Sequence, residues 1–385
     1  MSACRVKMLR NASRCVAVAA CILSLLPCGG LAAVAGRPAS GPGFSYTHDV
    51  VPNVPWSIHI VKIERGHPAL ELLPLPAHGS RLGLAVVSQI VQAVPKEWGQ
   101  PLAAINGDYF YSEKPYAGDP MGLQILRGEL ISGPSDERAC LWMDSNGNPT
   151  ITNLFPRFSV TWPDGTATPV GLNEMRGASS AVLYTAAIGK STRTYTGVEV
   201  VLERNGQEPW LPLRLGQRLK GRIRQLNHQG STELKPDVMV LSIGPKLASK
   251  LPKPAVGQVL EISTATKPLV TNAWMGIGGG PVLVRNGKAV PFEGIQIRHP
   301  RSAIGWNQTH FFLVEVDGRQ PGLSDGMTFD ELARYMIKLG CQHALNLDGG
   351  GSATIWVMGQ VMNSPSPGDE RPAANALVLI RKAGK

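Results

Sequence analysis

The stretch ALNLDGGGSATIWV, residues 344–357, combines carboxylate, amide, hydroxyl and glycine residues, which are types that bind or react with a polar ligand. An apolar run carries two polar side chains, three glycines follow, and two hydroxyl side chains come next: Asn346, Asp348, Gly349, Gly350, Gly351, Ser352 and Thr354. Three consecutive glycines lose much backbone entropy on folding, so a ligand or another backbone segment is expected to approach closely here. The amides of residues 349–352 are predicted to form an anion-binding nest, with the two hydroxyls as further donors.

Three further stretches place glycine beside polar groups where strands are expected to end. They are AINGDYF (104–110), GIGGGPVLVRNG (276–287), and RHPRSAIGW (298–306) with VEVDGRQ (314–320). Their candidate site residues are Asn106, Asp108, Gly279, Gly280, Arg301, Ser302, Asp317 and Arg319. Arginine presents a forked set of donors that suits phosphate oxygens. A carboxylate such as Asp317 or Asp348 is able to stabilise a developing positive charge or to activate water.

Each of these residues also has a plain structural interpretation. Glycines after a strand often only permit close packing or a bulge, and Asp317-Gly318 has the composition of an ordinary turn. His299 is a general acid or base, or a structural residue, and Tyr109 with Phe110 forms either a sugar platform or a core edge. Nucleotide binding is disfavoured because neither glycine-rich stretch is followed by the Lys-Ser/Thr of a P-loop. No loop has the oxygen spacing of an EF-hand.

In their order, HPRSAIG, DGR and LGCQHALNLDGGGSAT resemble the phosphodiester glycosidase family, with motifs from about residue 100 to 380. The resemblance implies hydrolysis of a sugar 1-phosphodiester at the anomeric carbon, without an organic cofactor. Arg371 and Asn375 resemble the closing strand of the family. The sequence has AINGDYF where Gly-Gly before the aromatics is often expected, which leaves the role of Asp108 open. A divalent cation such as Ca²⁺, shared by Asp348, Asp108 or Asp317, is a further hypothesis.

Two alternatives to a glycosidase remain at this stage. The first is a phosphodiesterase that cleaves the P–O bond. The second is a non-catalytic module of the cell envelope that binds carbohydrate or phosphate. Nucleic acid is disfavoured as a partner because the chain has no dense Lys/Arg run and no basic stripe interleaved with aromatics.

Alternating patterns and turn signals predict the elements that position these residues. Residues 56–64 are expected to form a strand, and Asn-Gly or Asp-Gly pairs predict turns within 144–149, 163–166, 204–207 and 285–288. Helices are predicted over 81–94 and 328–340, the second with a Thr328–Glu331 capping box. The predicted fold class is α+β, with a strand-rich mixed-sheet core and a few helices. We expect one domain over 56–385.

The composition and the N-terminus indicate an exported globular protein. The chain has 385 residues, 43% of them hydrophobic, and a net charge of +10. Residues 1–35 are interpreted as a signal peptide, with basic residues before an apolar core too short to span a membrane, and 36–55 as a linker. The expected location is secreted or periplasmic, and a lipoprotein modified at Cys21 or Cys28 is disfavoured. Cys140 and Cys341, which follow the leader, are expected to be buried thiols, with a disulfide as the alternative.

Overall fold

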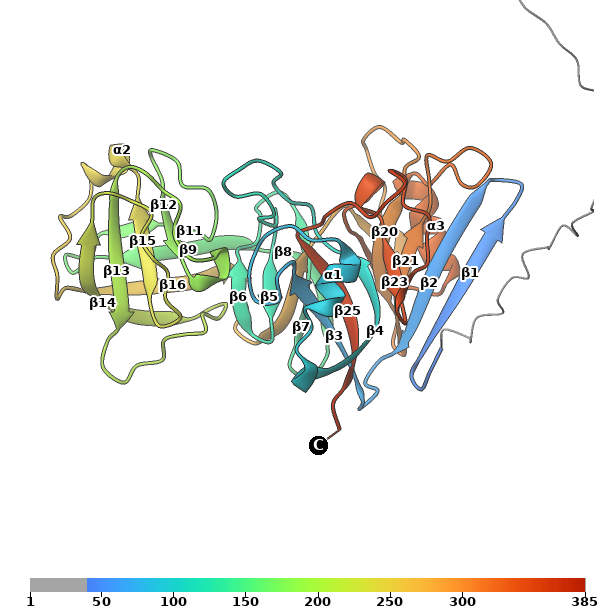
Figure 1. Ribbon diagram of the computed structural model, residues 1–385, viewed down its shortest axis with the longest axis horizontal. Coiled ribbons are helices and arrows are strands. Elements are labelled where there is room, and N and C mark those ends of the chain that lie inside the picture. The colour runs from blue at the N-terminus through green and yellow to red at the C-terminus, as the bar shows by residue number, and fades with distance from the viewer. Residues whose placement is uncertain (1–39, 385) are drawn as a thin grey trace, which may run out of the picture. The chain divides into compact units, whose positions relative to one another are not determined.

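The computed structural model describes residues 40–384 as four β-sheets with few helices (Figure 1). The predicted signal peptide lies outside the described residues. The helices are α1 Val87–Gln92, α2 Pro245–Ala248 and α3 Phe329–Lys338, with 3₁₀ turns η1 Lys96–Trp98, η2 Ala186–Ile188 and η3 Gly350–Ser352. Among the described residues, each helix is too short or too polar to cross a bilayer.

A seven-stranded sheet carries most of the sequence motifs. Its strand order is β1-β2-β21-β20-β22-β18-β19. The strands are β1 Phe44–Val51, β2 Trp56–Glu64, β18 Val282–Arg285, β19 Lys288–Ala289, β20 Arg301–Trp306, β21 His310–Val316 and β22 His343–Asn346. Helix α3 packs against one face of this sheet, where Leu332 and Met336 are fully buried.

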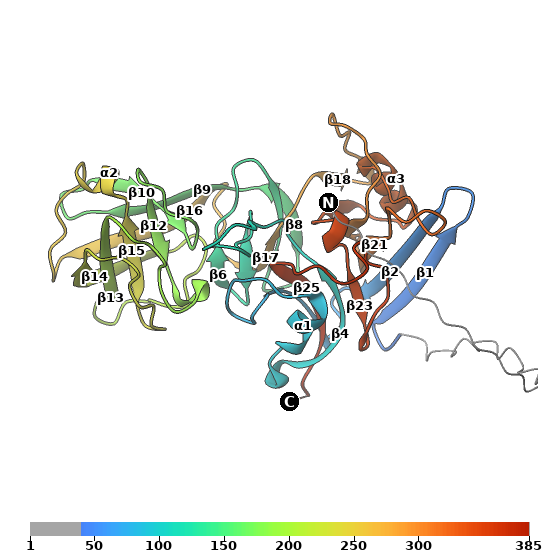
Figure 2. The same cartoon turned by 45° about the horizontal axis from the view of Figure 1, so that its top comes forward.

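A five-stranded sheet of order β24-β23-β4-β25-β3 forms a second layer, and α1 packs on β4 and β25 (Figure 2). Its strands are β3 Leu70–Pro76, β4 Gly99–Asn106, β23 Ile355–Val357, β24 Gln360–Val361 and β25 Asn375–Lys382. Another five-stranded sheet has the order β6-β5-β17-β7-β8. It contains β5 Gln124–Leu126, β6 Glu129–Ser132, β7 Ala139–Asp144, β8 Pro149–Asn153 and β17 Ala273–Gly278.

The fourth sheet is formed by the chain between β8 and β17. Its order is β10-β9-β16-β14-β13-β15-β12-β11. The strands are β9 Phe155–Thr161, β10 Ala167–Pro169, β11 Gly171–Leu172, β12 Ala181–Tyr184, β13 Val198–Arg204, β14 Arg218–Asn227, β15 Met239–Ile243 and β16 Val259–Lys267. Strand-rich sheets with a few helices therefore agree with the prediction. The ladders are antiparallel apart from β11 with β12, so the sheets are less mixed than expected.

The predicted linker over 36–55 contains a strand, which corrects that prediction. Phe44 to Val51 form β1, which pairs antiparallel with β2 from Phe44↔Ile63 to Val51↔Trp56. The sequence FSYTHDVV is rich in aromatic and β-branched residues, which favour a pleated surface. Its polar side chains are compatible with a strand at the edge of a sheet, where β1 lies.

The helix predicted over 81–94 is much shorter than expected. It is α1, only Val87–Gln92, and it begins after Val86, which has extended backbone angles. Gly83 has φ +152°, a conformation that a helix cannot include. The apolar pattern before Pro95 therefore predicted a helix that starts too close to the N-terminus.

The second predicted helix is confirmed as α3. The Thr328 side chain accepts from the Glu331 amide at 3.1 Å, and the Glu331 carboxylate accepts from the Thr328 amide at 2.9 Å. Gly340 follows the helix at φ +86°, the left-handed conformation that ends many helices. The turn signals at 144–149, 163–166 and 285–288 join antiparallel pairs, whereas 204–207 opens a longer connection from β13 to β14.

One five-stranded sheet has a core on each face. Leu141 and Ile277 belong to the core shared with β3, β4 and β25, whereas Ile125 and Cys140 belong to the core shared with the eight-stranded sheet. Cys140 and Cys341 are free and buried, as expected, and burial raises the pKa of each thiol to about 12.

Candidate functional site

Antiparallel pairing brings three of the predicted motifs together at the ends of neighbouring strands in the seven-stranded sheet. The start of β20, with Arg301 and Ser302, lies between the ends of β21 and β22, because Arg301 pairs with Val316 and Ala303 with Asn346. Asp317 directly follows β21, and Leu347 separates Asp348 from the end of β22. Motifs that are distant in the sequence therefore meet at these strand ends.

The end of β4 joins the neighbouring sheet to the same place through Asn106. Its Nδ2 donates to the carbonyl oxygen of Asp348 at 2.7 Å. Its Oδ1 accepts from the Ser302 hydroxyl at 2.6 Å and from the Thr354 amide at 3.1 Å. All four residues lie at most 8% exposed. Asn106, Ser302 and Thr354 are thus positioning residues for the Asp348 turn.

Asp348 is the predicted carboxylate that retains access to solvent. Its side chain is 12% exposed, its Oδ1 accepts from the Gly349 amide at 2.9 Å, and its Oδ2 lies 3.4 Å from Arg371 Nη2. Arg371 Nε also donates to the Ser352 hydroxyl at 2.9 Å. Burial raises the pKa of Asp348, while the hydrogen bond from Ser352 and the charge of Arg371 act in the opposite direction.

The loop that carries Arg371 is attached at both ends. Glu370 accepts from the amide and hydroxyl of Ser88 in α1, at 3.0 and 2.5 Å. At the other end, the Ser364 amide donates to Asp317 Oδ1 at 2.8 Å. This loop therefore holds the Arg371 guanidinium over the glycine turn.

Asp108 is a second, fully buried carboxylate near this site. Its Oδ1 accepts from the Tyr109 amide at 2.8 Å and from Arg138 Nη2 at 3.1 Å. Its Oδ2 has no hydrogen-bond partner among the described residues. Burial raises the pKa of Asp108 to about 7, against the lowering effect of Arg138, and the charge of Asp348 raises it further.

Two glycines make room for the Asp108 carboxyl group. A Cβ atom on Gly278 would lie 2.1 Å from Asp108 Oδ2, and one on Gly122 would lie 2.8 Å from it. The Asn375 side chain accepts from the Asp108 amide at 2.8 Å. Asn375 therefore positions the 107–109 backbone within the protein.

Tyr109 and Asn346 form a polar wall beside Asp108. The Asn346 Nδ2 donates to the Tyr109 hydroxyl at 2.9 Å, and that hydroxyl donates to the Gly280 carbonyl at 3.2 Å. The Arg138 guanidinium stacks over the Tyr109 ring at 4.1 Å. Gly279 packs against the Asn346 carbonyl, since a Cβ there would approach it to 2.6 Å. Asn346 Oδ1 is buried without a partner among the described residues.

The glycine turn does not form the anion nest predicted from the sequence. The Gly349 amide donates to its own neighbour Asp348, the Gly350 amide to the Pro300 carbonyl at 2.8 Å, and the Ser352 amide to the Gly349 carbonyl at 3.2 Å. A Cβ on Gly349 would lie 2.6 Å from the Pro300 carbonyl oxygen. The glycines therefore admit the 300–301 backbone, and not four amide donors to an anion. Gly351 likewise lies beside Pro367 and Arg371.

Arg319 is exposed beside this turn. It has φ +60°, and its Nε donates to His299 Nδ1 at 3.3 Å. A Cβ on Gly350 would lie 3.1 Å from Arg319 Nη2, so the guanidinium covers the turn. Burial and the neighbouring arginines lower the pKa of His299. Arg319 is therefore a cation available at the edge of the site.

Arg301 does not have the exposed fork expected of a phosphate ligand. Its Nε donates to the Met327 carbonyl at 2.9 Å and its Nη2 to the Ile297 carbonyl at 2.8 Å. Its guanidinium stacks on the Phe329 ring at 3.9 Å. Arg301 thus joins the loop before β20 to the start of α3.

Asp317 also differs from its expected role as a reacting carboxylate. It is 2% exposed, and its Oδ2 accepts from the Ser57 hydroxyl at 2.7 Å and lies 3.1 Å from His59 Nε2. Its Oδ1 accepts from the Ser364 amide. Both oxygens are occupied inside the protein, which leaves Asp348 as the better candidate.

The sequence reasoning missed Arg138. Its Nη2 pairs with Asp108, and its side chain is 22% exposed near Asp348, whose pKa its charge lowers. Arg138 stands in SDERAC, a stretch without glycine or strand-end pattern, so only the fold brings it to the site.

A divalent cation shared by the site carboxylates was a further prediction from the sequence. Within residues 40–384, the side chains that lie close enough together to hold a metal ion are His59, Glu315 and Asp317. Neither Asp348 nor Asp108 belongs to this group.

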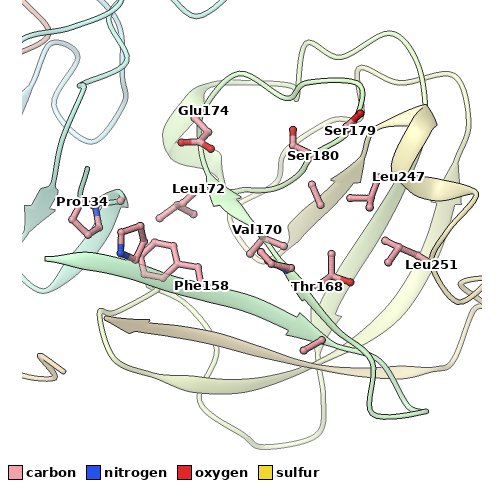
Figure 3. A pocket seen from close by; sticks show the side chains of 16 residues that line it. Pro134, Phe158, Thr168, Val170, Leu172, Glu174, Ser179, Ser180, Leu247 and Leu251 are labelled. Atoms are coloured by element: carbon pink, nitrogen blue, oxygen red, sulfur yellow. The ribbon is translucent and has the colours of Figure 1, made fainter. Parts of the chain in front are cut away.

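Two of the hollows among the described residues bear on where the chemistry lies. An open groove of about 590 Å³ adjoins the Asp348 cluster, lined by residues 296–298, 319–321 and Asp325. The second is a cavity of about 570 Å³ lined mainly by residues of the eight-stranded region. Figure 3 shows its lining side chains, among them Phe158, Leu172 and Leu247. None of the predicted site residues lines that second cavity, so we assign the chemistry to the motif cluster and not to it.

The comparisons with known proteins agree with the class of site. Residues 237–380 match the model of the phosphodiester glycosidase family, which confirms the resemblance over this part of the chain. Gly279, Arg301, Asp348 and Arg371 fall inside the match, whereas Asn106 and Arg138 precede it.

The proteins similar to this chain include one curated relative and two solved structures. The SPbeta prophage-derived protein YomE of Bacillus subtilis (strain 168) is 32% identical over 96 residues, 25% of this chain and 15% of YomE. A hypothetical protein from Synechocystis has a TM-score of 0.69 at 22% identity, covering 88% of this chain and 62% of its own. A candidate exported protein of Burkholderia pseudomallei K96243 has a TM-score of 0.65 at 22% identity, covering 84% and 74%. The two structures establish a shared fold.

Proposed function

We propose that this protein is an exported phosphodiester glycosidase, which hydrolyses a sugar 1-phosphodiester to a free sugar and a phosphomonoester. The observation that supports this most is the setting of Asp348. Its partly exposed carboxylate lies 3.4 Å from Arg371, and Arg319 covers the adjoining glycine turn. Guanidinium groups beside a carboxylate suit a substrate that is anionic at the phosphate and becomes cationic at the anomeric carbon.

Arg319 and Arg371 would hold the phosphate oxygens. Arg319 is exposed, and the Arg371 side chain is 46% exposed, so both are able to meet a ligand. The leaving group is a phosphate monoester, whose second pKa is about 6, so its departure needs little help from a general acid. Holding its charge is the larger requirement, and paired arginines meet it.

Asp348 would act at the anomeric carbon. Its carboxylate stabilises the oxocarbenium-like state or activates the water that attacks it. The water oxygen becomes the new hydroxyl of the sugar, and the bridging oxygen leaves with the phosphate. Arg138, held by Asp108, adds a further positive charge near Asp348 and supports its ionised form.

The substrate would belong to a surface or extracellular polysaccharide, which follows from the predicted signal peptide. The open groove beside Arg319 gives room for the part of the substrate beyond the phosphate. Arg298 and Arg319 are among its lining residues, with Asp325 as an acidic one.

A screen of sugar 1-phosphodiesters with purified protein, with and without chelator, tests the proposal. Asp348→Asn is expected to lower kcat by about 10² to 10⁴-fold with little change in substrate binding, because the amide cannot supply the negative charge. Asp237→Asn, at an exposed aspartate in the eight-stranded region, serves as the matched control and is expected to retain full activity. Equal activity of Asp348→Asn and wild type would refute the role of Asp348, and binding without hydrolysis of any substrate would favour a binding module.

A further inference from the structure

A buried cluster of His59, Glu315 and Asp317 lies on the seven-stranded sheet, apart from Asp348. His59 on β2 pairs directly with Glu315 on β21, and Asp317 follows two residues later. Each of the three side chains offers a ligand atom, and these atoms lie within 4.8 Å of one another. The residues are 2%, 0% and 2% exposed.

Glu315 lacks the donors that a buried carboxyl group requires. Neither of its oxygens has a hydrogen bond of ordinary distance and angle among the described residues, although the Asn363 side chain lies nearby. Asp317, in contrast, accepts from Ser57 and Ser364. Within 40–384, His59 Nε2 lies 3.1 Å from Asp317 Oδ2, and Glu315 forms no ion pair. A buried carboxylate without compensation costs several kcal/mol, so this arrangement is short of positive charge.

We infer that His59, Glu315 and Asp317 bind a first-row divalent cation such as Zn²⁺ or Mn²⁺. One imidazole nitrogen and two carboxylates form a donor set that such ions accept. Ca²⁺ prefers oxygen ligands alone, which makes an imidazole a poor choice for it. The unpartnered oxygens of Glu315 would complete the cation's coordination together with Asp317 Oδ2 and His59 Nε2.

The surroundings of His59 resemble the second layer of a metal site. The Tyr46 hydroxyl lies 2.8 Å from His59 Nδ1, so a proton on Nδ1 donated to Tyr46 leaves Nε2 free as a ligand. The exposed His48 ring stacks on His59 at 4.3 Å and contacts the Ser57 hydroxyl at 2.8 Å. An ion entering past His48 would therefore have a short path from solvent to the cluster.

The cation would reinforce the strand ends that carry the candidate active site. Glu315 pairs across the sheet with Ser302, whose hydroxyl donates to Asn106. Asp317 directly precedes Gly318 and Arg319. The inference concerns binding and stability, so it stands or falls independently of the proposed hydrolysis.

Metal content and thermal stability provide the test. Tag-free protein is treated with chelator, dialysed against Zn²⁺ or Mn²⁺, and its metal is measured by mass spectrometry. We expect one ion per chain, with a higher Tm than the chelator-treated protein. Glu315→Gln, which keeps the side-chain shape, is expected to weaken binding by about 10- to 100-fold or more, since loss of even supporting groups has this effect.

Glu199→Gln is the matched control. Glu199 is also fully buried, but it accepts from Thr194 and Thr232 in the eight-stranded sheet, so its variant should retain the ion. Wild-type protein that retains neither ion and shows no change in Tm would overturn the inference, whether or not any variant folds. Equal affinity in wild type and in folded Glu315→Gln would overturn it as well.

Discussion

At the scale of single residues, two neighbouring aspartates occupy different environments. Asp348 keeps contact with solvent and lies beside Arg371, whereas Asp108 is enclosed by Gly122, Gly278 and Arg138. Burial raises both pKa values. We therefore propose Asp348 as the reacting carboxylate, whereas Asp108 pairs with Arg138.

The burial of Asp108 predicts a pH-dependent cost to stability. Its pKa rises from 3.8 to about 7 on folding, so the folded protein binds more protons between these values. The contribution of this carboxyl group to the stability is then fully present below about pH 4, and it is lost as the pH rises through 7. As the pH rises from 4 to 8, the free energy of unfolding of Asp108→Asn is expected to increase by about 2–4 kcal/mol relative to that of the wild type.

Denaturant unfolding of both proteins at several pH values measures this difference. The comparison cancels the titration of other buried groups, such as Asp119, whose pKa burial raises to about 8. Parallel stability profiles for the two proteins would show that Asp108 is not the source of the effect.

At the scale of elements, the glycine turn works by letting two backbone segments meet. Gly349 has φ −136°, which other residues adopt, but its missing side chain leaves room for the Pro300 carbonyl. The Gly350 amide then donates to that carbonyl. The turn thereby fixes Asp348 relative to the start of β20.

Gly349→Ala tests this arrangement. The added methyl group would lie 2.6 Å from the Pro300 carbonyl oxygen, so the two backbone segments must separate. We expect the free energy of unfolding to fall by about 1–3 kcal/mol. Gly177→Ala, where the nearest atom is the Ser180 hydroxyl at 3.3 Å, is expected to change stability by less than about 0.5 kcal/mol. Thermal or denaturant unfolding measures both, and equal stability of the two variants would contradict the close approach.

Local signals in the sequence predicted elements well and side-chain roles less well. The capping box of α3 and the turn at 285–288 depend on nearby residues, and both are confirmed. The length of α1 depends on the backbone at Gly83 and Val86, which its apolar pattern does not reveal. The motifs correctly indicated residues that meet at strand ends, because the start of one antiparallel strand lies beside the end of its neighbour.

What the sequence lacked was the direction of each side chain. Arg301 lies on the face of β20 that packs on Phe329, so its fork is occupied by carbonyl groups. Asp317 lies over Ser57 and His59. Arg138 reaches the site from a segment without a motif. Such features depend on long-range pairing, which no local pattern encodes.

At the scale of the whole described molecule, one sheet connects two cores. Strands β5 and β7 place alternate residues into each, as with Leu141 and Cys140. The eight-stranded region therefore cannot lose its packing without exposing Ile125 and Cys140, which are at most 2% exposed. The cores are expected to depend on one another.

We accordingly predict one cooperative unfolding transition for residues 40–384. Far-UV circular dichroism and tryptophan fluorescence should give coincident curves, since Trp210 reports on one core and Trp306 on the other. Two separated transitions, with the fluorescence of single-tryptophan variants following different ones, would contradict the shared sheet.

The central claim is that water attacks the anomeric carbon beside Asp348. Hydrolysis of a sugar 1-phosphodiester in water enriched in oxygen-18, analysed by mass spectrometry of both products, tests it directly. The account predicts the label in the sugar hydroxyl and unlabelled phosphomonoester. Label in the phosphomonoester would show cleavage of the P–O bond and would contradict the account.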